Sequence, residues 1–145
     1  MHPLPHHYQV VSTSGPEGEV VLSHSDAAPL PSLSPPEFGG PGGYWSPETL
    51  LVGAIADCYA LTFRALARAK ALAWTALECH VEGTLARTDE GLRFTAYTVH
   101  AQLQVPAASD RDLALRLLQD SEHRCLISNS LKASGTLQAS VEVDA

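Results

Sequence analysis

The chain of 145 residues has the length of one ordinary domain, and its hydrophobic fraction of 45% is enough for a buried core. Its formal net charge is −7, from 9 basic and 16 acidic residues, and residues 1–63 contain no lysine or arginine. Nucleic acids and anionic membranes bind clustered cations, so this balance argues against both kinds of partner. We predict a single domain, residues 1–145.

The cysteine content and the apolar segments indicate a cytoplasmic protein. Three cysteines are too few, and odd in number, for a secreted disulfide framework. The N-terminal segment has neither the basic start nor the apolar run of a signal peptide. The longest apolar segment is interrupted by Asp57 and Arg64, so it falls short of the roughly 18 uncharged residues typical of a membrane span.

The N-terminal third predicts a β-hairpin followed by a long loop. Two β-prone runs, Tyr8–Ser12 and Glu19–Ser23, flank a turn that contains glycine and proline. The segment Ala27–Trp45 is rich in proline and glycine and has no periodicity, so we expect an ordered loop there, although its composition alone fits a flexible connector equally well.

A long apolar helix is predicted next. Ser46 followed by Pro47 is a typical helix start, Glu48 suits the positive end of the helix dipole, and the helix should continue to about Lys70. Apolar residues lie nearly all around it as far as Arg64, a pattern typical of a helix that is buried on every side.

The remaining segments complete an α+β fold. Residues 77–85 and 92–105 alternate apolar and polar side chains around a turn at Asp89, Glu90 and Gly91, which predicts a long hairpin. Residues 109–125 form an amphipathic helix capped by Ser109, and residues 135–143 form a last strand. The predicted order is ββ–α–ββ–α–β, with an antiparallel sheet around the long helix.

The length of the central helix predicts a homodimer. At 1.5 Å per residue it spans roughly 36 Å, more than five strands of one small chain can cover on all sides. A second copy of the chain would cover the rest, with the two long helices paired.

The three cysteines differ in their settings. Cys79 lies on the apolar side of a strand and is expected to be structural. Cys58 lies beside Asp57, a residue that is costly to bury without a partner. Cys125 follows Arg124 near a helix end, a setting that can activate a thiol. Cys58 and Cys125 could form a nucleophile and resolver pair if the fold brings them together. No metal is expected, because the following residues lack zinc-site spacing: Cys58, Cys79, His80, His123 and Cys125.

Two motifs resemble the OsmC/Ohr family, the osmotically inducible and organic-hydroperoxide-resistance proteins. The first is the glycine-rich segment at residues 39–43, followed by Ser46-Pro47-Glu48 and by Cys58 ten residues after the glutamate. The second, Cys125-Leu126-Ile127-Ser128, is similar to the family's Cys-Pro-Val-Ser. The resemblance covers most of the chain and implies a divergent OsmC-like member that forms an intertwined homodimer.

The resemblance also implies a reaction, a cysteine-based peroxidase that uses no cofactor. Cys58 would attack a small organic hydroperoxide and become a sulfenic acid, Cys125 would resolve it as a disulfide, and a dithiol would supply the electrons. Glu48 would match the family's glutamate, which orients an arginine at the thiolate. Because Glu48 and Cys58 lie about 15 Å apart along one helix, Glu48 would act on Cys58 of the other subunit.

One departure keeps a second interpretation open. The segments where the family carries its arginine contain none here, and Pro16 stands where the hairpin arginine is expected. Without a cation, a thiolate is less favoured. Arg64, Arg124 or His24 could substitute. The alternative is a non-peroxidatic relative that binds a small apolar molecule, or senses redox state, at the dimer interface.

Overall fold

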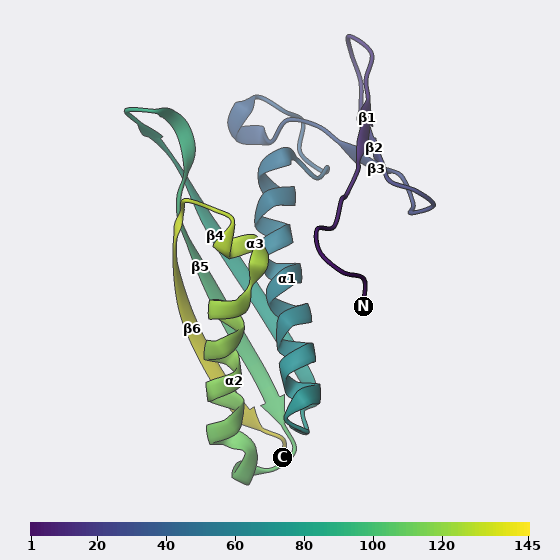
Figure 1. The fold of residues 1–145 in the computed structure, drawn as a ribbon. Helices are drawn as coiled ribbons and strands as arrows, with labels where there is room; N and C mark the ends of the chain where they lie inside the picture. Colours follow the sequence, from purple (N-terminus) through teal and green to yellow (C-terminus); the bar gives the residue numbers. More distant parts are fainter. The chain divides into compact units, whose positions relative to one another are not determined.

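The computed structural model describes residues 1–145, and the chain divides into two compact units, residues 1–50 and 51–145. The first unit contains a three-stranded antiparallel sheet of β1 (Val11–Thr13), β2 (Val20–Ser23) and β3 (Leu30–Ser32), followed by the short helix η1 (Pro36–Phe38) (Figure 1). The predicted hairpin is confirmed. Strand β3 falls inside the predicted loop. The sequence pattern did not indicate this strand because its central residue is Pro31. A proline is tolerated here because β3 is an edge strand.

The helix α1 (Pro47–Ala69) begins where the sequence predicts. Ser46 and Thr49 cap it reciprocally. The backbone N–H of Thr49 donates to Oγ of Ser46 at 3.2 Å, and the backbone N–H of Ser46 donates to Oγ1 of Thr49 at 2.9 Å. These bonds satisfy two donors that a helix start would otherwise leave unpaired.

The second unit contains a three-stranded sheet of β4 (Ala76–Thr88), β5 (Gly91–Val105) and β6 (Ser134–Val143). Strands β4 and β5 form the predicted antiparallel hairpin. Strand β6 pairs with β5 in parallel, which corrects the prediction of an antiparallel sheet at this position. The reason is the connection. The chain leaves β5 through η2 (Ala108–Asp110), α2 (Arg111–Arg124) and α3 (Leu126–Asn129), and a helical crossover returns the next strand in the same direction.

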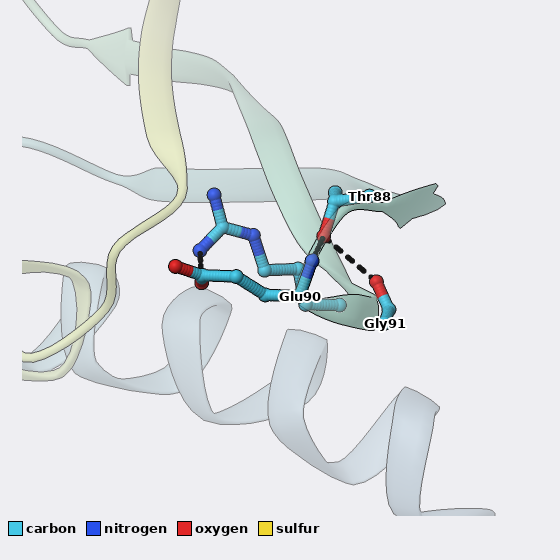
Figure 2. A network of polar contacts seen from close by, with 4 residues as sticks. Thr88, Glu90 and Gly91 are labelled. Carbon is cyan, nitrogen blue, oxygen red and sulfur yellow. Dashed lines mark hydrogen bonds and ion pairs between the residues drawn. The ribbon is translucent and has the colours of Figure 1, made fainter.

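Polar contacts fix the turn between β4 and β5, as Figure 2 shows. Oγ1 of Thr88 donates to the carbonyl of Gly91 at 2.8 Å and accepts from the backbone N–H of Glu90 at 3.2 Å. Arg93 forms an exposed ion pair with Glu90 at 3.0 Å. Gly91 has a φ of 101°, which favours glycine. The predicted turn is therefore confirmed.

The core of the second unit lies on one face of its sheet. Alternate residues of β5, from Tyr97 to Val105, are buried, whereas Gln102 and Gln104 between them are exposed. Figure 1 shows α2 and residues 51–69 of α1 along the same face. The helix α2 begins after Asp110, so the predicted cap at Ser109 is wrong by one residue.

The helix α1 buries less of its surface than the sequence predicts. Its buried residues, Ile55, Tyr59, Phe63 and Ala67, form a single stripe at four-residue spacing. Leu61 is 52% exposed. By length and composition this helix could cross a membrane, with a mean hydropathy of 1.5 over 18 residues, but the core helix of a soluble protein passes the same test. A single chain therefore leaves much apolar surface of α1 uncovered.

Candidate functional site

Cys58 lies on α1, next to the buried stripe, and is half-buried. Its sulfur lies 4.0 Å from Oγ1 of Thr62, one helical turn later. Asp57 is exposed, so its carboxylate needs no buried partner. The acid that the sequence places beside the thiol therefore points to solvent.

Cys125 lies between α2 and α3 with an extended backbone conformation, and it is fully buried. The Ser128 hydroxyl donates a hydrogen bond to its sulfur at 3.3 Å. Burial raises the pKa of the Cys125 thiol, hydrogen bonds from Ser128 oppose this rise, and a hydrogen bond and charge repulsion from Cys58 add to it. The fold thus makes Cys58 and Cys125, 67 positions apart in the sequence, close neighbours with free thiols.

Cys79 is the third thiol and packs against the core from β4, as its position in the strand predicts. Burial raises its pKa to about 11, with smaller contributions from the charges of Cys125 and Glu122. A thiol with so high a pKa is almost entirely protonated near neutral pH. This protonation agrees with the structural role predicted for Cys79.

The sequence prediction does not include Tyr97 and Glu122, a part-buried pair close to Cys125. The Tyr97 hydroxyl donates to Oε1 of Glu122 at 2.7 Å, whereas Oε2 of Glu122 is buried and has no hydrogen-bond partner. Burial raises the pKa of Tyr97, the nearby Ser128 hydroxyl lowers it, and Glu122 and Cys125 raise it. A tyrosine on the core side of a strand was the available signal, because a buried phenol needs a partner.

The candidate cations do not contact Cys58 within the second unit. Arg64 and Arg124 are exposed, and neither hydrogen-bonds to the thiol. His24 lies in the first unit, where its ring contacts the carbonyl of Gln9 at 3.2 Å. No three histidine, cysteine or acidic residues gather as a metal site would require.

Glu48 lies in the first turn of α1 and is half-buried. Its Oε2 is buried without a hydrogen-bond partner. A buried carboxylate oxygen without a donor is costly, so it is the kind of atom that a cation or an N–H donor would stabilise.

Known proteins support this description of the chain. Residues 40–140 match the family model described as OsmC-like protein. The uncharacterized protein YmaD of Bacillus subtilis is 30% identical over 113 residues, or 75% of each chain. Strands and helices superpose on an OsmC-like protein of unknown function from Vibrio cholerae with a TM-score of 0.85 at 13% identity, covering 94% of this chain and all of that one.

A second similar structure has a functional name. It is the organic hydroperoxide resistance protein OsmC, a predicted redox protein, from Legionella pneumophila, with a TM-score of 0.74 at 21% identity, covering 97% of this chain and 99% of that one. These structures share the mixed α+β fold predicted from the sequence, and the family match includes both Cys58 and Cys125. The chain belongs to the OsmC-like family.

Proposed function

We propose that this protein is a thiol peroxidase that reduces organic hydroperoxides. The observation that carries the proposal is the proximity of two free thiols, Cys58 and Cys125, inside an OsmC-like fold. The name of the Legionella relative supports a role in hydroperoxide resistance. The apolar residues around Cys58 favour an alkyl or lipid hydroperoxide over hydrogen peroxide.

The reaction has three balanced steps. The Cys58 thiolate attacks the O–O bond, takes one oxygen as a sulfenic acid and releases an alcohol once the leaving oxygen is protonated. Cys125 then attacks the Cys58 sulfur, so that an S–S bond forms, the S–O bond breaks and water leaves. A dithiol finally exchanges with the disulfide and returns both cysteines to thiols.

We also propose a homodimer in which α1 pairs with its copy. The uncovered apolar surface of α1, including Leu61, supports this arrangement. Antiparallel pairing would bring Glu48 of one subunit near Cys58 of the other. The unpartnered Oε2 of Glu48 would then be available to hold a cation there.

The test is a single turnover of the reduced protein with one equivalent of cumene hydroperoxide, followed by intact mass under non-reducing conditions. We expect the wild type to lose two hydrogens, and Cys58→Ser and Cys125→Ser to lose none. Cys79→Ser is the matched control and should behave as the wild type. A wild type that keeps its mass for minutes would rule the peroxidase out.

One observation favours a second candidate. Neither Arg64 nor Arg124 hydrogen-bonds to Cys58, whose polar neighbours are the Thr62 hydroxyl and the Cys125 thiol. A relative without an activating cation would use its apolar interface to bind a small molecule or to sense redox state. If the disulfide forms only slowly and the protein does not catalyse turnover of added hydroperoxide, that alternative is supported.

A further inference from the structure

Two histidines lie side by side on the solvent face of the second unit's sheet. His80 of β4 and His100 of β5 are register partners in the antiparallel ladder, so their side chains leave the same face of the sheet. Their ring centroids lie 5.8 Å apart, with the ring planes at 61°. Val99 and Ala101, on either side of His100, are buried, so the two imidazoles point away from the core. Core packing therefore does not account for this pair.

The spacing of the two rings fits one shared metal ion. Neutral imidazole is the commonest metal ligand among protein side chains. An ion bound about 2.0–2.1 Å from one nitrogen of each ring would hold the two ring centroids about 5 Å apart. His80 is exposed and His100 is half-buried, so side-chain rotation alone can close the remaining distance. The ladder thus places both ligands of such an ion before it binds.

The charges around the pair favour a cation. The parts of β4, β5 and β6 that surround it, residues 76–84, 96–104 and 134–142, contain no lysine or arginine. Glu78 and Glu82 flank His80 at the next exposed positions of β4, on the same face. A surface that carries one sign of charge raises the local concentration of ions of the opposite sign.

A hollow beside the pair leaves room for water. Its volume is about 330 Å³, and its lining includes Glu78, Gln102 and Glu142. Glu78 and Gln102 are register partners and lie next to the histidine pair along the ladder. No third histidine, cysteine or acidic residue joins the two imidazoles to form a complete ligand set. Water molecules would therefore fill the other coordination positions, as they do in open metal sites.

We propose that His80 and His100 form a surface site for one late first-row divalent cation, of which Zn²⁺ is the probe. Imidazole suits Zn²⁺, Ni²⁺ and Cu²⁺, whereas Mg²⁺ and Ca²⁺ prefer oxygen ligands. Binding forms two metal–nitrogen bonds, displaces water from the ion and changes no oxidation state. The site shares no ligand with Cys58 or Cys125, so it does not depend on the proposed peroxidase function.

The test follows each histidine ring separately in proton–nitrogen correlation spectra of the reduced, full-length chain. Zn²⁺ is added from a glycine buffer that fixes its free concentration, above about pH 7, where imidazole is neutral. Because the spectra resolve single rings, Zn²⁺ taken up by the thiols or by other histidines does not enter the result. His80→Gln and His100→Gln are compared with the control His123→Gln, which removes an exposed histidine of α2. Backbone amide signals check that each variant stays folded.

In the wild type, we expect the rings of His80 and His100 to respond together, with one shared Kd. In either pair variant, the remaining ring should bind Zn²⁺ about a hundredfold more weakly, the low end of the gain from linking two binding groups. His123→Gln should leave the shared curve unchanged. Separate Kd values for the two rings in the wild type would overturn the site. So would a remaining ring that keeps the wild-type affinity, or a pair that binds no more tightly than His123 alone.

Discussion

Gly135 of β6 lies directly beneath the ring of Tyr97 on β5. The two residues are register partners in the parallel ladder, and a Cβ at Gly135 would overlap the Cζ carbon and hydroxyl oxygen of Tyr97. A side chain at this position would therefore displace the phenol. Because Gly135 has no side chain, the Tyr97 ring can lie across β6 and its hydroxyl can reach Glu122 on α2.

Gly135→Ala should consequently destabilise the protein by about 1–3 kcal/mol, the usual cost of overpacking. Urea unfolding measures this change. Gly15→Ala is the matched control, because its added Cβ would meet only the carbonyl of Glu17 at 3.8 Å, an ordinary contact. Equal stability of the two variants would show that the Tyr97 ring moves aside at no cost.

The cap of α1 makes a second prediction. Ser46→Ala removes the oxygen that accepts from the Thr49 N–H, so the free energy of unfolding should fall by about 1 kcal/mol. Ser140→Ala, at an exposed position of β6, is the control and should change little. A denaturation midpoint for Ser46→Ala that matches the wild type would contradict the cap.

Local chemistry explains what could be predicted from the sequence. The hairpin turn at Gly91 and the helix start at Pro47 depend on neighbouring residues, so their patterns carried the information. The parallel direction of β6 depends on the path of α2 across the sheet, which no local pattern records. Strand β3 was missed because Pro31 resembles a loop residue.

The candidate site divides in the same way. The sequence motifs identified Cys58 and Cys125, but only tertiary packing makes them neighbours. The contact between Tyr97 and Glu122 joins positions 25 residues apart. It also depends on Gly135, because a side chain there would overlap the Tyr97 ring. Neither relationship leaves a spacing signature. The burial of α1 was overestimated because one sheet face covers one stripe of a helix, whatever its composition.

Alkaline pH should weaken the fold. In the unfolded chain the Cys79 thiol ionises near its ordinary pKa of 9.0, whereas burial holds its pKa near 11 in the fold. Between these values the unfolded state binds fewer protons than the folded state, so stability falls as pH rises. Buried Tyr59, whose pKa is also raised, acts in the same direction at higher pH.

Urea unfolding under reducing conditions at about pH 8 and pH 10.5 measures this fall. Cys79→Ala should lose less stability over the same range than the wild type, because one of the responsible thiols is gone. Leu92→Ala, at an exposed position, serves as the control. If the free energy of unfolding stays level or rises over this range, the folded state does not hold the Cys79 thiol at a raised pKa.

The same pKa sets the reactivity of Cys79. With its pKa near 11 in place of 9.0, the thiolate fraction at pH 8 is about a hundredfold lower than for an ordinary cysteine. Iodoacetamide should therefore alkylate Cys79 of the folded, reduced protein about a hundredfold more slowly than it alkylates a model cysteine peptide. Peptide mapping after timed quenching measures the ratio, and the urea-unfolded protein is the control in which the rates should converge. Equal rates in the folded state would contradict the raised pKa.

The uncovered side of α1 makes the last prediction. Leu61 is 52% exposed on α1, and pairing with a second copy would remove it from water. Leu61→Glu would place a charge in that pair, so the proposed dimer, twice the 15.4 kDa chain, should dissociate to monomer in sedimentation equilibrium. Leu126→Glu, at a position 67% exposed after Cys125, is the matched control and should remain dimeric. If Leu61→Glu keeps the wild-type mass at micromolar concentration, α1 is not the pairing surface, and Glu48 would need a cation from its own chain.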